Sequence, residues 1–362
     1  MVLNPLQMLF PKKFLGIDIG TSYIKVVELS KVGRRVKLEN YGSFIATALY
    51  QKPFRTFERS TLLLSSVDIA RAILAILEEA KIKTKEAIFS IPDFSSFFTS
   101  FQLPKMTKEE LPQAIRYEAR SHVPLPLGEV TLDWQVEEPK PKDINQNFNI
   151  LLVAVPNEVI NQYKEIAKLT QLELFSLEAE VFGLVRAIIP ADLNLPVALI
   201  DIGAQSTTCS IVDKQKLKLS HSFDMSGNEL TRMAAQSLNI DFQKGEELKK
   251  KYGISPTAQE LGAQGLRDVL LPLIDVILKE VEETIANYLT RTGRDVQKVI
   301  LAGGSGLMPG LREYLAQSLK KEVEVANPFS QIFYPPILEE KLKEMGPSYS
   351  VALGMALRGF EY

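Results

Sequence analysis

The chain has 362 residues, enough for two domains of ordinary size or one bilobed unit. Its formal net charge is −2, so the chain as a whole exerts no bulk attraction on nucleic acid or anionic lipid, although local basic patches remain open. We therefore expect no nucleic-acid partner. Cys209 is the single cysteine and two histidines are present, which excludes an intrachain disulfide framework and argues against a cysteine- or histidine-based metal centre.

Residues 1–12 are expected to form a loose leader, in which an apolar stretch precedes Lys12. In a secretory signal the charge precedes a longer apolar stretch, so this order does not fit one. Elsewhere no apolar run approaches the roughly 20 residues that span a bilayer. We expect a cytoplasmic protein, with a leader that touches a membrane as the alternative.

A similar pattern occurs twice along the chain. Residues 14–30 (FLGIDIGTSYIKVVELS) have the pattern of an apolar strand, a glycine turn and a second strand, and residues 197–213 (VALIDIGAQSTTCSIVD) repeat it. A further strand-like run follows each, over residues 36–46 and 217–224. Glycine supplies the backbone freedom of a tight turn, and β-branched residues favour the flanking strands. The repeat predicts an internally duplicated α/β protein.

The segment between the two hairpins carries an expected insertion. Thr107 and Glu110 form a capping box before a helix that runs to about His122. Two strands and a second helix follow, so residues 105–176 are expected to form an inserted α-β-β-α subdomain. Beyond the second hairpin, apolar spacing predicts several helices, the last of which should return to the first half of the chain.

Both glycine turns would present successive backbone N–H groups, and such a concave row binds anions. The turn residues that would approach phosphate are Gly20, Thr21 and Ser22 in the first turn and Gly203, Ala204, Gln205 and Ser206 in the second. Asp18 and Asp201 end the incoming apolar strands, where a carboxylate is costly unless it is paired or helps to bind a cation. The two carboxylates suit Mg²⁺ held largely through its own water molecules. Lys25 would reach the β- and γ-phosphates of a nucleotide.

Two further motifs are weaker when taken alone. The run Gly303, Gly304, Ser305 and Gly306 follows a predicted buried strand and would let an adenine ring lie against bare backbone, or it is an ordinary strand-to-helix turn. Glu246 and Lys249 lie three residues apart on one helical face. Taken singly they indicate a solvated charge pair, so their assignment to a nucleotide depends on the other motifs.

Together these motifs resemble the actin-like ATPase superfamily, which includes actin, MreB, FtsA, DnaK-type chaperone ATPases and sugar kinases. GIDIGTSYIK and ALIDIGAQST are similar to its two phosphate motifs, LAGGSGLMPG to its adenosine motif, and EELKKKYG to the helix beside the ribose and adenine. IFSIPDF and PSYSVALGMAL occupy the places of the two connecting segments. The resemblance covers essentially the whole chain. It implies a bilobed actin-like (duplicated ribonuclease H-like) α/β fold with ATP and Mg²⁺ between the lobes, and it adds Gly227 and Met308 to the expected nucleotide contacts.

Within the superfamily, EELPQAIRYEARSHVPLPLGEVTLDW and the ending ALRGFEY resemble the PilM family of type IV pilus assembly proteins. This resemblance implies an FtsA-type insertion and a groove between insertion and first lobe that accepts the N-terminal cytoplasmic peptide of the inner-membrane protein PilN. It implies a scaffold or switch recruited to the cytoplasmic face of the inner membrane, with other pilus assembly proteins as partners and a homo-oligomer left open. The expected division is a first lobe of 13–104, 177–196 and 338–362, the insertion, a second-lobe base of 197–227 and 291–337, and an outer part of 228–290.

Hydrolysis of ATP requires a group that orients the attacking water. Asp201 is the nearest candidate, acting directly or through the Mg²⁺ shell, whereas IPDFSSFF lacks the glutamine or glutamate that actin-type hydrolases place near it. We expect nucleotide binding with weak or partner-dependent hydrolysis. One alternative is an FtsA-like filament-forming protein. The other is a small-molecule kinase with Asp93 as its base, although an exposed turn is the simpler interpretation of Asp93.

Overall fold

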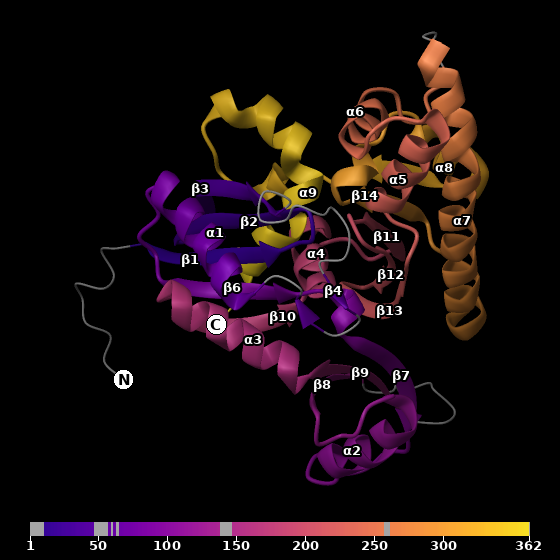
Figure 1. Ribbon diagram of the computed structural model, residues 1–362. Helices are drawn as coiled ribbons and strands as arrows, with labels where there is room; N and C mark the ends of the chain where they lie inside the picture. The colour runs from indigo at the N-terminus through magenta and orange to yellow at the C-terminus, as the bar shows by residue number, and fades with distance from the viewer. Residues whose placement is uncertain are drawn as a thin grey trace.

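The computed structural model describes residues 11–46, 57–58, 61–62, 65–137, 147–256 and 261–361 (Figure 1). Most of the expected leader, residues 1–10, lies outside this part of the chain. The described residues form two five-stranded mixed sheets, one three-stranded sheet and a short pair of strands, β4 (Phe57–Glu58) and β5 (Thr61–Leu62). None of the helices in these ranges is long and apolar enough to cross a membrane.

The two large sheets have the same strand order, which confirms the predicted duplication. The order in the first is β10-β6-β1-β2-β3, and in the second β15-β14-β11-β12-β13. In the first sheet β1, β2 and β3 pair antiparallel, and β6 and β10 continue the sheet from β1 in parallel pairing. The second sheet repeats this pattern with β11, β12 and β13 antiparallel and β14 and β15 parallel. The strands are β1 (Lys12–Ile19), β2 (Tyr23–Val32), β3 (Arg35–Ile45), β6 (Glu86–Ile91), β10 (Glu173–Ala179), β11 (Val197–Ile202), β12 (Thr207–Asp213), β13 (Lys216–Phe223), β14 (Lys298–Ala302) and β15 (Glu322–Val325).

Each sheet is covered by its own helices. On the first sheet, α1 (Ser66–Glu79) and α3 (Asn157–Thr170) pack together over an apolar core. On the second, α5 (Gly227–Leu238), α7 (Leu261–Thr292) and α8 (Leu311–Leu319) cover a second core, and α6 (Phe242–Tyr252) packs on α5. The two lobes therefore each bury a hydrophobic face, as a duplicated α/β fold requires.

Two helices, α4 (Glu180–Ile188) and α9 (Glu339–Arg358), join the lobes (Figure 1). They belong to a core cluster that includes residues of both sheets. The two helices cross closely at Gly183 and Gly354, where a Cβ on Gly354 would lie 1.9 Å from the carbonyl oxygen of Gly183. Only glycine permits this approach, so Gly183 and Gly354 determine how closely α4 and α9 pack. The predicted return of the last helix to the first half of the chain is confirmed, because α9 contacts β1 and β2.

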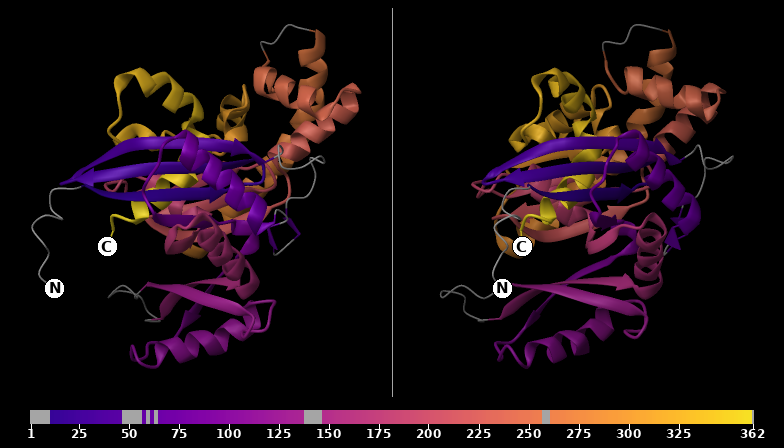
Figure 2. Two further views of the ribbon diagram at one scale, coloured as in Figure 1. Left: turned by 60° about the vertical axis from the view of Figure 1, so that its left-hand side comes forward. Right: turned by 90° about the vertical axis from the view of Figure 1, so that its left-hand side faces the viewer.

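The insertion projects from the first lobe beyond α3 (Figure 2). Its sheet has the order β7 (Phe97–Leu103), β9 (Phe148–Pro156) and β8 (Val130–Glu137), and α2 (Leu111–His122) packs on it. The predicted capping box is present, because the Thr107 backbone N–H donates to Glu110 Oε2 over 2.9 Å and the Glu110 N–H donates to Thr107 Oγ1 over 3.3 Å.

The bounds of the insertion differ from the expected 105–176 at both ends. The strand Phe97–Leu103 pairs with β9 along its whole length, so this sheet begins before residue 105. At the other end, α3 packs on α1 and β10 pairs with β6, so both belong to the first lobe. Residues 97–156 thus form a β-α-β-β unit. Neither difference is visible locally, because pairing between distant strands decides both.

Candidate functional site

The two predicted hairpin turns have the same local geometry. The Gly20 N–H donates to the Tyr23 carbonyl oxygen over 3.1 Å, and the Gly203 N–H donates to the Ser206 carbonyl oxygen over 3.0 Å. The expected phosphate contacts in these turns, Gly20, Thr21, Ser22, Gly203, Ala204, Gln205 and Ser206, are all partly buried. The turns are therefore accessible from outside and are alike in construction.

Charged groups of the two hairpins interact electrostatically. Asp18, at the end of β1, accepts hydrogen bonds from Lys25 Nζ over 3.2 Å and from Ser90 Oγ over 3.0 Å. Burial raises the pKa of Asp201 to about 6, Lys25 offsets part of that rise, and repulsion by Asp18 adds to it. For Lys25, burial lowers the pKa, but Asp18 and then Asp201 outweigh it and raise the pKa above its usual value. The carboxylates of the two hairpins are thus within electrostatic reach of one another and of one lysine.

The second turn also contacts the glycine-rich segment after β14. Gly303 has a φ of +78°, and a Cβ there would lie 2.4 Å from Asp201 Oδ1. The Gly227 N–H donates to the Gly203 carbonyl oxygen over 2.9 Å, and a Cβ on Gly227 would lie 2.3 Å from Ser305 Oγ. Glycine at 303 and 227 therefore lets three segments of the second lobe converge.

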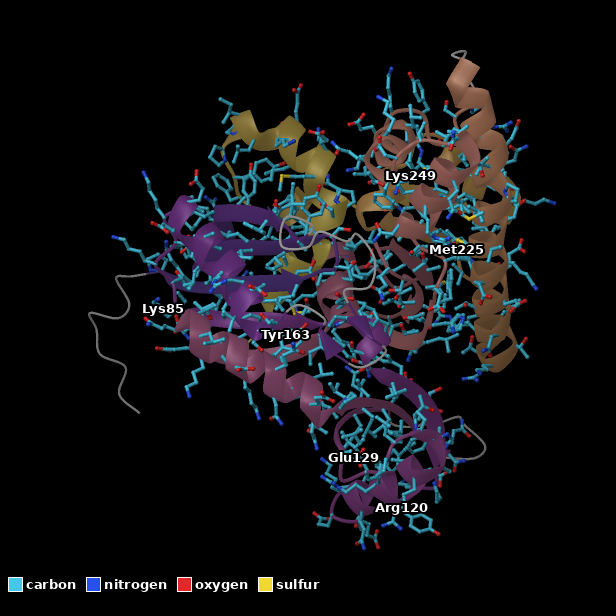
Figure 3. All side chains as sticks on the ribbon, viewed as in Figure 1. Lys85, Arg120, Glu129, Tyr163, Met225 and Lys249 are labelled. Atoms are coloured by element: carbon cyan, nitrogen blue, oxygen red, sulfur yellow. The ribbon has the colours of Figure 1, made fainter. Side chains whose placement is uncertain are left out.

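Lys249 is buried, which makes the solvated-pair interpretation wrong for it. It is 3% exposed, and its Nζ lies 2.8 Å from the Gly227 carbonyl oxygen, 2.7 Å from Thr231 Oγ1 and 2.7 Å from Glu246 Oε2 (Figure 3). These contacts use all three donors of the ammonium group. Burial lowers the pKa of Lys249, and Glu246 offsets part of the effect. Lys249 thus positions Glu246 and ties α6 to the start of α5.

The residues of the glycine-rich segment after β14 differ in their exposure to solvent. Gly304 is exposed and Gly306 is buried. Met308 is 5% exposed and packs in the core of the second lobe, where a Cβ on Gly253 would lie 2.7 Å from its Cγ. The place of Met308 is therefore explained by packing.

Two acidic residues near the hairpins have surroundings that the sequence did not indicate. Asp93 is 2% exposed, so the interpretation as an exposed turn is wrong. Its Oδ1 accepts a hydrogen bond from the Val181 N–H over 3.2 Å, and its own N–H donates to Glu180 Oε2 over 3.3 Å. Ala179, which precedes α4, makes no capping hydrogen bond, so Asp93 caps that helix from 88 residues away. Asp93 lies within the first connecting motif, IFSIPDF, but nothing near it in the sequence predicts its partner.

Glu180 lies at the centre of this acidic environment. Burial raises its pKa well above the usual value, and Asp18, Asp93 and Asp201 each raise it further. For Asp93, burial raises the pKa to about 7, the Val181 N–H lowers it, and Asp201 raises it. Asp93 Oδ2 and the Tyr163 hydroxyl have no hydrogen-bond partner among the described residues, and Tyr163 lies where α3 meets the first sheet (Figure 3).

This arrangement suits a cation bound through water. Four acidic side chains interact with one another here, and Lys25 offsets the charge of only Asp18 and Asp201, so a bound cation would stabilise the ionised carboxylates. Among the described residues no group of three histidine, cysteine or acidic side chains is placed to hold a metal directly. Mg²⁺ does not require one, because it keeps several waters and is bound through one or two carboxylates together with substrate phosphates. Asp18 and Asp201 therefore fit the role of carboxylates that hold a hydrated Mg²⁺.

The duplicated sheets with their matching glycine turns form the fold of the actin-like ATPases. Residues 16–360 match the family described as type IV pilus assembly protein PilM, and the chain belongs to that family.

A solved structure agrees with this assignment, and a further structure and a curated relative are more distantly similar. A solved PilM-PilN type IV pilus biogenesis complex superposes with a TM-score of 0.82 at 25% identity, covering 96% of this chain and 98% of that one. MreB5 of Spiroplasma citri bound to ADP shares the fold, with a TM-score of 0.55 at 15% identity and coverage of 97% and 96%. The cell division protein FtsA of Rhizobium meliloti is 22% identical over 191 residues, which are 47% of this chain and 42% of that protein. The match thus spans less than half the length of this curated relative.

Proposed function

We propose that the chain binds Mg·ATP between its two hairpin turns and acts as a scaffold or switch in type IV pilus assembly. The observation that carries the proposal is the mutual influence of Asp18, Lys25 and Asp201, which come from both hairpins. A ligand lying between the turns would contact all three groups. MreB5 of Spiroplasma citri, which has the same fold, was solved with ADP bound, and this supports a nucleotide as the ligand.

Each part of the nucleotide has a matching group. The N–H groups of the two turns and the Lys25 ammonium would bind the phosphates, because fixed donors and a point charge both favour anions. Asp18 and Asp201 would hold the hydrated Mg²⁺, which neutralises phosphate charge when bound. Glu246 would accept hydrogen bonds from the ribose hydroxyls, and Gly303, Gly304 and Ser305 would lie beside the adenine.

Glu180 supplies the group for hydrolysis that the sequence did not indicate. Its carboxylate comes from the start of α4 and lies within electrostatic reach of Asp18 and Asp201. As an anion it would orient and deprotonate a water beside the γ-phosphate, with Asp201 as the second candidate. Since its pKa is raised so far, the group is a poor base until positive charge enters, which agrees with weak or partner-dependent turnover. The kinase alternative loses support, because the buried Asp93 cannot act on a separate substrate.

The insertion contacts the second lobe as well as the first, and this gives the switch a physical route. Lys218 on β13 forms an ion pair with Glu137 on β8, with 2.6 Å between Nζ and Oε2. The Arg291 guanidinium at the end of α7 donates to Ser100 Oγ on β7 over 3.2 Å. A nucleotide that draws the lobes together would therefore also move the insertion relative to the first lobe.

The groove between insertion and first lobe would accept the cytoplasmic N-terminal peptide of PilN, and other inner-membrane pilus proteins would be further partners. The similarity to the solved PilM-PilN complex supports this choice. The chain would then act at the cytoplasmic face of the inner membrane. Filament formation of the FtsA type stays the second candidate, supported by the FtsA match.

Calorimetric titration of a synthetic PilN N-terminal peptide into the protein tests the proposal. We expect peptide affinities that differ at least fivefold between the nucleotide-free and the Mg·ATP-loaded protein, a coupling of about 1 kcal/mol. A peptide with scrambled sequence is the control. Equal affinities in both states would refute the switch, and no detectable nucleotide binding would refute the site.

A further inference from the structure

Three parallel strands of the first sheet end at the edge that carries the first glycine turn. β1 pairs with β6, and β6 pairs with β10, in parallel in both cases. The residues that follow β6 and β10 therefore lie at the carboxyl ends of these strands, where α/β sheets bind their ligands. Asp93 comes two positions after the last paired residue of β6, and Glu180 comes directly after β10. The sheet thus brings two acids that are 87 residues apart to one edge.

Two hydrogen bonds join these segments reciprocally. The Asp93 N–H donates to Glu180 Oε2 over 3.3 Å, and Asp93 Oδ1 accepts from the Val181 N–H over 3.2 Å. Each segment thus provides an acceptor for a backbone donor of the other, as the two residues of a capping box do within one helix. Val181 is fully buried and Ala179 makes no capping hydrogen bond, so Asp93 supplies the acceptor that the start of α4 needs.

The backbone on both sides of these hydrogen bonds is fixed. Pro92 precedes Asp93, and its ring restricts the backbone angle φ, which is −57°. The Ser95 N–H donates to the Pro92 carbonyl oxygen over 2.9 Å and closes a tight turn. One turn into α4, Gly183 lies against α9. Because both segments are held in place, the hydrogen bonds between them can set the position of a side chain precisely enough for chemistry.

The exposure of the two acids assigns them different roles. Asp93 is buried, and its Oδ1 is occupied by the Val181 N–H. Glu180 is partly exposed, and its Oε2 is held by the Asp93 N–H. Glu180 can therefore meet a water molecule in the site, whereas Asp93 acts on that water only through Glu180.

We propose that Asp93 is a positioning residue that holds Glu180 and the start of α4 in the orientation needed for hydrolysis. The inference rests on the proposed function, in which Glu180 orients and deprotonates the attacking water. In that step the water oxygen bonds to the γ-phosphorus, the bond to the bridging oxygen breaks to release ADP, and the water proton passes to Glu180 Oε1. A displacement of about 1 Å in such a group lowers turnover by up to about a hundredfold, so Asp93 should affect turnover more than nucleotide affinity.

Three substitutions of Asp93 separate its geometry from its charge. Turnover is phosphate release at saturating Mg·ATP with the PilN peptide present, counted per site that binds a fluorescent ATP analogue. Asp93→Asn keeps the Oδ1 acceptor and puts an amide in place of Oδ2, which has no partner among the described residues, so turnover should stay within about threefold of wild type. Asp93→Glu keeps the charge but moves the acceptor by one methylene, and Asp93→Ala removes the acceptor.

Both Asp93→Glu and Asp93→Ala should lower turnover at least about tenfold, while the affinity for Mg·ATP stays within about threefold. A role that depends on charge predicts the reverse order, with the glutamate variant active and the asparagine variant impaired. That order would overturn the proposal. If circular dichroism shows that Asp93→Ala does not fold, the asparagine and glutamate variants decide the question.

A double-mutant cycle shows whether Asp93 acts through Glu180. Asp93→Ala added to Glu180→Gln should lower turnover by less than about twofold further, because the residue to be positioned is already lost. A further tenfold loss would mean that Asp93 acts independently, which would overturn the proposal. The matched control is Thr107→Ala, which removes the cap of α2 on the face of the insertion sheet opposite the first lobe. It should keep turnover within about twofold, and a loss equal to that of Asp93→Ala would also overturn the proposal.

Hydrogen exchange of the Val181 amide, measured by NMR without nucleotide, tests the positioning separately from hydrolysis. Exchange should be at least about tenfold faster in Asp93→Ala and within about threefold of wild type in Asp93→Asn. Unchanged exchange in Asp93→Ala would overturn the proposal whatever the turnover. Unchanged turnover in Glu180→Gln would refute the proposed base and this inference with it. Reduced turnover in Glu180→Gln with full turnover in Asp93→Ala would overturn this inference alone.

Discussion

The raised pKa of Asp201 leads to a prediction in which stability and binding change in opposite directions. Its folded-state pKa of about 6 lies above the ordinary 3.8, so the folded protein favours the protonated form. The free energy of unfolding therefore falls as pH rises through this interval. Above pH 6 the ionised Asp201 lowers the stability of the folded protein by its full amount. The shift of about two units corresponds to about 3 kcal/mol at most, and since Asp201 is partly exposed we expect about 1–3 kcal/mol.

Asp201→Asn removes the destabilisation caused by the ionised carboxylate. It also removes a negative charge that would hold the hydrated Mg²⁺. At about pH 7.5 the variant should be more stable than the wild type by about 1–3 kcal/mol, and at about pH 4 the difference should nearly vanish. Its affinity for Mg·ATP should fall by about tenfold to a hundredfold, because a charge-assisted contact contributes about 1.5–3 kcal/mol. Urea denaturation at the two pH values measures the first effect, and titration with a fluorescent ATP analogue measures the second. A variant that is less stable at the higher pH, or that binds Mg·ATP as the wild type does, would refute the reasoning.

Three further predictions concern the positioning of groups around the site. Lys249→Met should lower the free energy of unfolding by about 1–3 kcal/mol in urea titrations, because it removes a buried donor from the Gly227 carbonyl oxygen and the half-buried Glu246; Lys244→Met, an exposed lysine on the same helix, should change it by less than about 0.5 kcal/mol. Lys218→Glu and Glu137→Lys should each weaken the effect of Mg·ATP on peptide affinity in calorimetry, and the exchanged pair in one chain should restore it; an effect of Mg·ATP that survives in both single variants would contradict the route through this ion pair. Glu180→Gln should reduce phosphate release with the peptide present at least about tenfold while nucleotide affinity stays within about threefold, and equal phosphate release would exclude Glu180 as the base.

Structural features that depend on residues close together in the sequence could be predicted. Each hairpin is a contiguous run of apolar strand, glycine turn and strand, so its existence and its duplication followed from pattern alone. The capping box at Thr107 also depends on residues three apart. The position of α9 followed from its apolar run, which needs a large apolar surface on which to pack.

Features that depend on distant pairing were not predictable. Asp93 is buried where α4 brings the Val181 N–H to it, and no residue close to Asp93 in the sequence indicates that contact. Lys249 looks like a surface lysine in its helix, but Gly227 and Thr231 from α5 surround it. The edge of the insertion moved for the same reason, since β7 pairs with β9, a strand that begins only after α2 and β8 have intervened.

In the proposed function, both glycine turns bind the phosphates of a single nucleotide. A crystal structure of the chain with Mg²⁺ and a non-hydrolysable ATP analogue tests it most directly. We expect phosphate oxygens within hydrogen-bonding distance of N–H groups in residues 20–22 and in residues 203–206 at once, with the metal between Asp18 and Asp201. A nucleotide that contacts one turn alone, or that lies elsewhere on the protein, would contradict the account.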